Sequence, residues 1–326
     1  MSAAPALAVG WAADAAVGDP RRFHPVAGFG AAAARVEGRW WRDSRAAGTT
    51  YAGMLVGAPT VAVWALDRWA RRRGAVPAGL LTAAVVWAAT GGRSLAAAGR
   101  RLAGALDRDD LPAAREILPS LCGRDPSGLD AKALAQAGVE SLAENTADAV
   151  TGPLVWGALA GPAGAVAHRC ANTLDAMVGH RSPRHARFGW AAARLDDALG
   201  WLPARVTTVL LAALAPAVGG SARAAWATAR RDGGRHPSPN AGRCEAAMAG
   251  GLGVRLGGTI RYGDGQGGPA PRAAGGTELR GPFGHGPPPG PADVRRAVRL
   301  SRLAGAAAAA LASTASLAAT APWRQR

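Results

Sequence analysis

The sequence predicts an all-α, polytopic helical membrane protein, and three observations support this fold class. Several apolar runs of 15 to 20 residues alternate with arginine-rich connectors, and about 20 apolar residues suffice to cross a bilayer. Hydrophobic residues make up 49% of the chain and charged residues only 18%, below the usual share in soluble domains. No strand-like alternation stands out. We expect one integral-membrane domain over residues 1–326; the alternative is a soluble bundle with buried alanine-rich helices.

Six apolar runs are candidate spans. In order they cover residues 3–18, 51–66, 78–92, 149–168, 201–220 and 303–321. The first is short for a crossing helix. The fourth contains Pro153 and Pro162, and its glycine and proline content suits a broken or re-entrant helix packed inside protein. We expect this segment to enter the membrane and return, or its halves to line a cavity.

A returning segment keeps the polar blocks 93–147 and 169–200 on one side of the membrane. The positive-inside rule places both in the cytoplasm of a bacterium, at its inner membrane. The basic stretch "RWARRR" between the second and third runs does not fit this rule. Residues 263–292 are rich in glycine and proline and are expected to form a loose linker. A helix is expected to restart at "ADVRRAVRLSRLAG".

The strong positive charge does not indicate nucleic-acid binding. The chain has 38 basic and 22 acidic residues, a net charge of +16, and Lys132 is its single lysine. The arginines lie between apolar runs, as in a polytopic membrane protein, and form no basic tail. Cys122, Cys170 and Cys244 are isolated, which disfavours a disulfide framework or a zinc site. The sequence also lacks a Walker loop, a G-x-S-x-G elbow and an H-E-x-x-H helix.

The segment "ESLAENTADAV" crowds acids at the start of an apolar run. Glu140, Glu144 and Asp148 are four residues apart, so they share one helix face, with Asn145 beside them. Like charges at this spacing cost a few tenths of a kcal/mol per pair. The stripe is therefore either a solvated acidic face or a cation site. Carboxylate and amide oxygens suit Mg²⁺, which keeps several waters and bridges to substrate phosphates.

Three further polar clusters lie beside apolar runs. They comprise Arg169, Asn172 and Asp175; Arg194, Asp196 and Asp197; and His236, Ser238, Asn240 and Glu245. Each has a simpler interpretation. Paired aspartates before a helix can reflect the helix dipole, a histidine before proline is more often a turn residue, and Glu245 can be a helix-start acid. Their joint occurrence next to apolar runs favours one polar site.

Several of these segments resemble the adenosylcobinamide-phosphate synthases of cobalamin biosynthesis, the CobD/CbiB family. The resemblance rests on "GDPRRFHPV", "GRDPSGLD", "ESLAENTADAVTGPL", "NTLDAMVGHRSPRHARFGWAAARLDDALGWLPAR" and "HPSPNAGRCEAAMAGGLGVRLGGTIRYG". It implies an inner-membrane ligase that uses ATP and Mg²⁺. Such an enzyme joins a propionate carboxylate of adenosylcobyric acid, a corrinoid, to (R)-1-aminopropan-2-ol or its O-phosphate. Other membrane enzymes of cobamide assembly are possible partners.

The resemblance also suggests roles for the polar clusters. Metal binding is expected at Glu144, Asp148, Asp196 and Asp197. Catalytic roles are expected for Glu140, Glu144, Asp175 and His236, with His236 as the general base for the incoming ammonium. Substrate binding is expected at Asn145, Arg169, Asn172, Arg194, Ser238, Asn240 and Glu245.

Two other functions remain open. A transporter, or a scaffold for cobamide assembly, would also carry acids beside a proline-broken helix. Most of the acids lie at the ends of apolar runs or in polar blocks, which favours a site at the membrane face over a transport path. A paralogue that has lost the chemistry is the third possibility, and the intact set of acids disfavours it.

Overall fold

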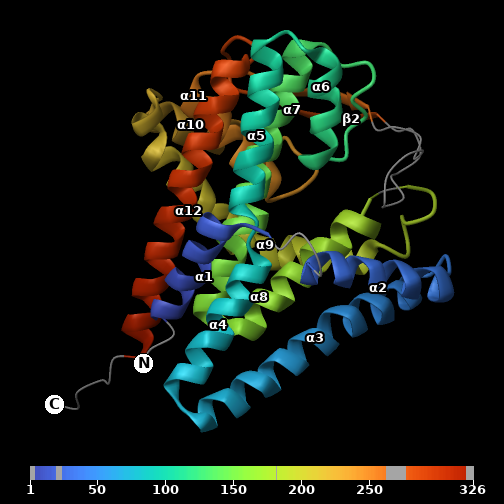
Figure 1. Ribbon diagram of the computed structural model, residues 1–326. Helices are drawn as coiled ribbons and strands as arrows, with labels where there is room; N and C mark the ends of the chain where they lie inside the picture. The colour runs from blue at the N-terminus through green and yellow to red at the C-terminus, as the bar shows by residue number, and fades with distance from the viewer. Residues whose placement is uncertain (1–3, 20–23, 181, 262–276, 321–326) are drawn as a thin grey trace.

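The computed structural model describes residues 4–19, 24–180, 182–261 and 277–320 (Figure 1). Within these ranges the chain is mostly helical, which confirms the predicted all-α class. The helices are α1 (Ala4–Val17), α2 (Pro25–Trp40), α3 (Arg45–Arg73), α4 (Ala75–Ala89), α5 (Gly92–Asp107), α6 (Leu111–Ile117), α7 (Ala131–Thr146), α8 (Gly152–Val178), α9 (Trp190–Leu214), α10 (Ala222–Asp232), α11 (Ala241–Leu252) and α12 (Pro291–Thr320).

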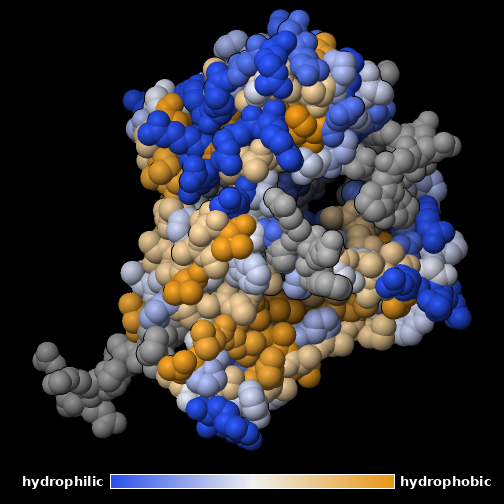
Figure 2. All heavy atoms as spheres, in the orientation of Figure 1, coloured by the Kyte–Doolittle hydropathy of each residue, from blue (hydrophilic) through white to orange (hydrophobic). Residues whose placement is uncertain are grey.

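Five helical segments are long and apolar enough to cross a membrane, as the sequence predicts. They are Arg45–Arg73, Ala75–Asp107, Ala131–Val178, Trp190–Val218 and Pro291–Leu317. The first apolar run forms a shorter helix, Pro5–Val17. Figure 2 shows a broad apolar surface over the part of the molecule that contains α1, α3 and α4, and a polar surface around α5, α6 and α7. Exposed Trp64 and Leu80 belong to the apolar surface. The protein is therefore a polytopic membrane protein.

Helix α8 has the break that its glycine and proline content predicts. Its backbone leaves helical geometry at Ala160 and Gly161, where Gly161 has φ 66°. The two arms fold back on each other, because a Cβ at Gly152 would lie 2.1 Å from Cε1 of His168. A Cβ at Gly157 would likewise approach the Ala165 side chain. The segment is a helical hairpin, so its two ends return to the same side.

One part of the fold departs from the sequence prediction. Strands β1 (Leu256–Arg261) and β2 (Thr277–Phe283) form an antiparallel pair. We expected loose chain throughout 263–292, but 277–283 is paired; residues 262–276 lie outside the described residues. The strand pattern was hidden because β1 contains two glycines and β2 contains a Gly-Pro step. The expected helix restart is confirmed, since α12 begins at Pro291.

Two hydrophobic cores hold the helices together. The larger one packs α5, α7, α11 and α12 and includes Leu102, Leu142 and Met248. The smaller one joins α2, α3, α8 and the start of α9, where the Tyr51 and Phe188 rings lie 4.9 Å apart. This second core fixes the returning arm of α8 against the N-terminal helices, and so fixes the residues that the arm carries.

The basic stretch that did not fit the positive-inside rule lies at the junction of α3 and α4. Figure 1 places this junction at the end of the molecule opposite α5 and α6, and Figure 2 shows polar residues gathered there. Arg71 makes an ion pair with Asp67 at 2.7 Å, and Arg73 lies over the Trp69 ring. Both ends of the bundle therefore carry arginines.

Candidate active site

A turn of π-helix, Ala147–Thr151, joins α7 to α8, and such turns are frequent at functional sites. It carries Asp148 toward the returning arm of α8. Asp148 interacts electrostatically with Glu144 and Asp175. Asp196 at the start of α9 interacts with Asp148, Asp175 and Asp197. We call Glu144, Asp148, Asp175, Asp196 and Asp197 the acidic cluster. The hairpin is what brings these residues together from three helices.

The acidic cluster has the chemistry of a magnesium site. The Asn172 side chain is within hydrogen-bonding reach of both Asp148 and Asp196. Oδ1 of Asp196 is buried and has no hydrogen-bond partner among the described residues, which is costly unless a cation or water satisfies it. In the described part of the chain, no three His, Cys, Asp or Glu side chains converge tightly enough to hold a metal alone. Mg²⁺ commonly uses one or two carboxylates and completes its shell with water and phosphate oxygens, so this donor set fits it.

The two arginines expected to bind phosphate have different surroundings. Arg194 is exposed and lies 3.1 Å from Asp197, one turn further along α9. Arg169 contacts Oδ1 of Asn172 at 3.5 Å, and its buried Nε has no hydrogen-bond partner among the described residues. Arg169 therefore keeps an N–H donor for an anion, whereas Arg194 is already paired.

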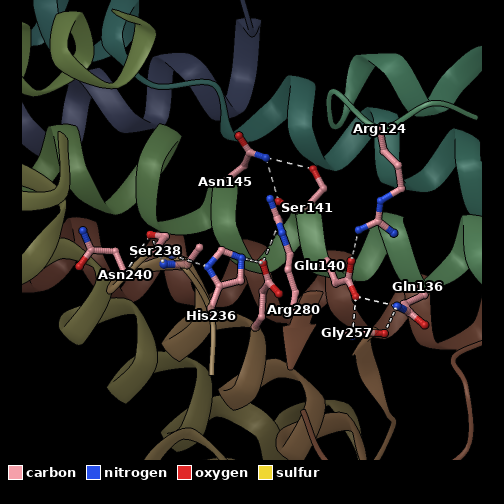
Figure 3. Close-up of polar contacts among 12 residues, drawn as sticks. Arg124, Gln136, Glu140, Ser141, Asn145, His236, Ser238, Asn240, Gly257 and Arg280 are labelled. Atoms are coloured by element: carbon pink, nitrogen blue, oxygen red, sulfur yellow. Dashed lines mark hydrogen bonds and ion pairs between the residues drawn. The ribbon is translucent and has the colours of Figure 1, made fainter. Parts of the chain in front are cut away.

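Glu140 serves as an anchor in this structure (Figure 3). Its Oε2 accepts from Arg124 at 2.5 Å, and its Oε1 accepts from the Gln136 amide at 2.9 Å and from the Gly257 N–H at 2.7 Å. Gln136 also donates to the Gly257 carbonyl. Both oxygens are thus occupied. Glu140 ties β1 and the segment before α7 to α7.

A second group of charges surrounds Glu245, which is fully buried on α11. Its Oε1 lies 3.7 Å from Nε2 of His236 and 3.8 Å from the Arg280 guanidinium, and neither carboxylate oxygen has a hydrogen-bond partner among the described residues. Burial raises the pKa of Glu245 well above its usual value, and the negative charges of Glu140 and Glu144 raise it further. A buried carboxylate whose pKa is perturbed in this way is a candidate functional group.

His236 is held in a way that weakens its expected role as a general base. Its Nδ1 accepts the Ser238 N–H at 2.8 Å, so a neutral ring carries its proton on Nε2. That nitrogen faces Glu245, and the side chain is only 3% exposed. The structure therefore directs the Nε2 N–H of a neutral His236 toward the Glu245 carboxylate.

The remaining predicted substrate-binding residues make internal hydrogen bonds. Asn145 donates to the Ser141 carbonyl and hydroxyl. Ser238 caps the start of α11 by accepting the N–H groups of Asn240 and Ala241. Asn240 donates to the Asp197 carbonyl at 2.8 Å and accepts from Arg205 at 2.6 Å. These three side chains position the helices that carry the acids.

Sequence reasoning missed three residues around the site. Arg124 pairs with Glu140, Gln136 holds Gly257, and Arg280 faces Glu245. Arg124 lies within the segment "GRDPSGLD", so a search for cations opposite the acids could have found it. Arg280 lies in the segment that looked like loose linker, and no sequence signal marked it.

Comparison with known proteins gives a consistent result. Residues 7–301 match the family model described as CobD/Cbib protein. "Cobalamin biosynthesis protein CobD" from Mycobacterium tuberculosis is 50% identical over 295 residues, covering 90% of each chain. The protein of the same name from Rhodobacter capsulatus is 40% identical over 305 residues, 91% of this chain and 90% of the relative. No solved structure matches. The chain belongs to the CobD/CbiB family of cobalamin biosynthesis proteins.

Proposed function

We propose that the protein is an ATP- and Mg²⁺-dependent amide ligase, an adenosylcobinamide-phosphate synthase. It joins a propionate carboxylate of adenosylcobyric acid to (R)-1-aminopropan-2-ol or its O-phosphate. The acidic cluster is the observation that supports this proposal most strongly. Five carboxylates from α7, the π-turn, α8 and α9 interact there, and their mutual repulsion favours binding of a divalent cation.

The chemistry needs an activated carboxylate, because a carboxylate does not condense with an amine at neutral pH. Attack of the propionate oxygen on the γ-phosphorus of ATP releases ADP and gives an acyl phosphate. The amine nitrogen then attacks the acyl carbon, phosphate leaves with the carbon–oxygen bond electrons, and the nitrogen loses a proton. When bound, Mg²⁺ neutralises phosphate charge and orients the reacting groups.

The side chains divide into two groups under this proposal. Glu144, Asp148, Asp196 and Asp197 would supply the one or two carboxylates that hold Mg²⁺ together with water and phosphate oxygens, and Asn172 orients two of these four side chains. Arg169 offers its buried N–H to a phosphate, since guanidinium donors match phosphate oxygens.

The second group lies around Glu245, which we assign to the amine. A buried carboxylate is a suitable acceptor for an ammonium group and its proton. Glu140 accepts the Gly257 N–H and so fixes β1 beside this group. His236 lies against the Glu245 carboxylate and positions it. We place the site at the cytoplasmic face of the bacterial inner membrane, where ATP is supplied.

The proposal is tested with purified protein in detergent, adenosylcobyric acid, either amine, ATP and Mg²⁺, with corrinoid products followed by mass. We expect an amide product that needs both nucleotide and metal. Glu144→Gln is expected to lower turnover by at least about 100-fold, as loss of a group that stabilises transition-state charge commonly does. Glu116→Gln is the matched control, because Glu116 is exposed on α6, away from the cluster.

Two results would contradict the proposal. Folded protein that forms no amide with either amine would favour the transporter or scaffold alternative. Equal turnover of Glu144→Gln and Glu116→Gln would show that the acidic cluster does not take part in the chemistry. Comparing the free and phosphorylated amines in the same assay identifies the substrate.

A further inference from the structure

The outward face of α10 forms a basic and aromatic surface that the proposed chemistry does not use. Its spacing of three and four residues places five side chains on one side of the helix. These residues are exposed and line one surface groove of 520 Å³: Arg223, Trp226, Ala227, Arg230 and Arg231. We call them the basic face. The opposite side of α10 packs against α9 and α11.

The basic face carries positive charge that the described part of the chain does not pair. Arg231 is paired, because its guanidinium donates to the two carboxylate oxygens of Asp232 at 2.9 and 2.6 Å. Asp232 is the one acid of α10, and it is buried, where it also accepts the Gly284 N–H. Arg223 and Arg230 have no ion-pair partner among the described residues. The face therefore presents two unpaired guanidinium groups, with an exposed tryptophan between them in the sequence.

The end of α10 lies beside an exposed apolar element. A Cβ at Gly233, directly after α10, would lie 3.1 Å from Cα of Arg243, so α10 ends at the start of α11. That start is fixed to α9, because Asn240 accepts a hydrogen bond from Arg205 at 2.6 Å. Helix α9 belongs to a segment that is apolar enough to cross a membrane, and it exposes Trp201. The basic face thus adjoins a helix with an apolar outer surface.

The position of α10 fits the headgroup layer of a bilayer. Figure 1 places α10 in the polar part of the molecule, beside the upper part of α12. Figure 2 shows polar and apolar residues mixed at this place, with the broad apolar surface directly below it. Tryptophan is enriched at this level of membrane proteins because its ring is amphipathic, and the long arginine side chain reaches from an apolar surface to the headgroups.

We propose that the basic face of α10 binds the headgroup phosphates of anionic phospholipids in the adjoining leaflet. Arg223 and Arg230 donate N–H groups to the phosphates, because the guanidinium fork matches phosphate oxygens, and Trp226 lies at the interface between headgroups and chains. An acidic protein would have to reach the same face through a headgroup layer that already covers it. The proposal goes beyond the ligase function, because it concerns lipid binding and needs no turnover.

Native mass spectrometry of protein released from nanodiscs tests the headgroup preference. The nanodiscs contain phosphatidylglycerol and phosphatidylcholine in equal amounts and with the same chains. We expect the wild type to retain phosphatidylglycerol preferentially. The double variant Arg223→Gln/Arg230→Gln should lose about 25-fold of this preference, since each arginine near an anionic surface contributes about fivefold. Arg108→Gln is the matched control, because Arg108 is exposed at the end of α5.

A fluorescent probe on the same face tests contact with the bilayer. Bimane is attached to Ala227→Cys or, as the control, to Glu116→Cys, at an exposed position of α6. The unsubstituted protein, labelled in parallel, corrects for Cys122. A lipid with a nitroxide on its headgroup should quench the probe at position 227 and spare the probe at position 116. The phosphatidylglycerol preference should also vanish at about 1 M salt, where the Debye length is about 3 Å.

Three results would overturn the proposal, provided that circular dichroism shows each variant to be folded. They are equal retention of the two lipids by the wild type, an equal preference in the double variant and in Arg108→Gln, and equal quenching at positions 227 and 116. Binding of polyglutamate that requires Arg223 and Arg230, without quenching at position 227, would assign the basic face to an acidic protein instead.

Discussion

The buried pair of Arg124 and Glu140 offers the sharpest test of the energetics described above. Their side chains are 10% and 3% exposed, so solvent screens the pair little. Arg124→Met removes the cation and leaves a buried carboxylate. Breaking a buried pair from one side costs about 3–5 kcal/mol. Glu140 retains hydrogen bonds from Gln136 and Gly257, so we expect about 3 kcal/mol, the lower end of this range.

A double variant separates the lost charge from the lost packing. Glu140→Gln in the Arg124→Met background removes the uncompensated charge while keeping an acceptor for the Gly257 N–H. We expect it to recover about 1–2 kcal/mol of the loss. Arg108→Met serves as the control, because Arg108 is exposed in the same polar part of the molecule.

Denaturant unfolding in detergent micelles, followed by circular dichroism, gives the free energies. Labelling of the Cys122 thiol gives a local measurement two residues from Arg124. Burial raises the pKa of this thiol, so the native protein should react slowly. A loss of about 3 kcal/mol accelerates labelling on the order of 100-fold when reaction requires unfolding. Arg124→Met within about 0.5 kcal/mol of the wild type, the usual range for surface changes, would refute the reasoning.

Three further predictions concern other parts of the molecule. Gly48→Ala should destabilise the protein by about 1–3 kcal/mol, because its Cβ would lie 1.8 Å from the Phe188 carbonyl oxygen. Gly53→Ala places its Cβ in open space and should stabilise the protein by about 0.5–1 kcal/mol. Thermal unfolding in micelles compares the two variants. The raised pKa of Glu245 means that the wild type loses stability as pH rises above the unfolded-state pKa, by at most about 1.4 kcal/mol per pH unit. Glu245→Gln should therefore gain stability relative to the wild type between about pH 5 and pH 8, and a constant difference would contradict this cause. Asp196→Asn should raise the Mg²⁺ concentration for half-maximal amide formation by about tenfold or more, and an unchanged metal requirement would remove Asp196 from the magnesium site.

Much of the fold was predictable because long apolar runs and proline punctuation are local signals. Pro162 and the glycines around it indicated the break in α8, and the structure has that break at Ala160 and Gly161. The strand pair was not predictable in the same way. Leu256 pairs with Phe283 and Gly258 with Arg280, across a stretch whose composition is that of a loop.

The candidate site shows the same division between local and distant information. The spacing of Glu140, Glu144 and Asp148 was visible in the sequence, but their different roles were not. Glu140 is satisfied by Arg124 and Gly257, and the latter lies more than a hundred positions away. Only the tertiary structure shows which acid is neutralised and which acid remains available for a cation.

The hairpin in α8 also constrains how the protein is made. Its entering arm within α8 has only the residues from Gly152 to about Ala160, about 12 Å of helix at 1.5 Å per residue, which by itself does not reach across about 30 Å of hydrocarbon. The arm therefore enters the membrane by packing against helices that are already inserted. Helix α12 contacts α1, α7, α8 and α9 and is synthesised after all of them. Enclosure of the acidic cluster is thus a late step of biogenesis, and truncation within α12 should leave an inserted but incompletely assembled protein.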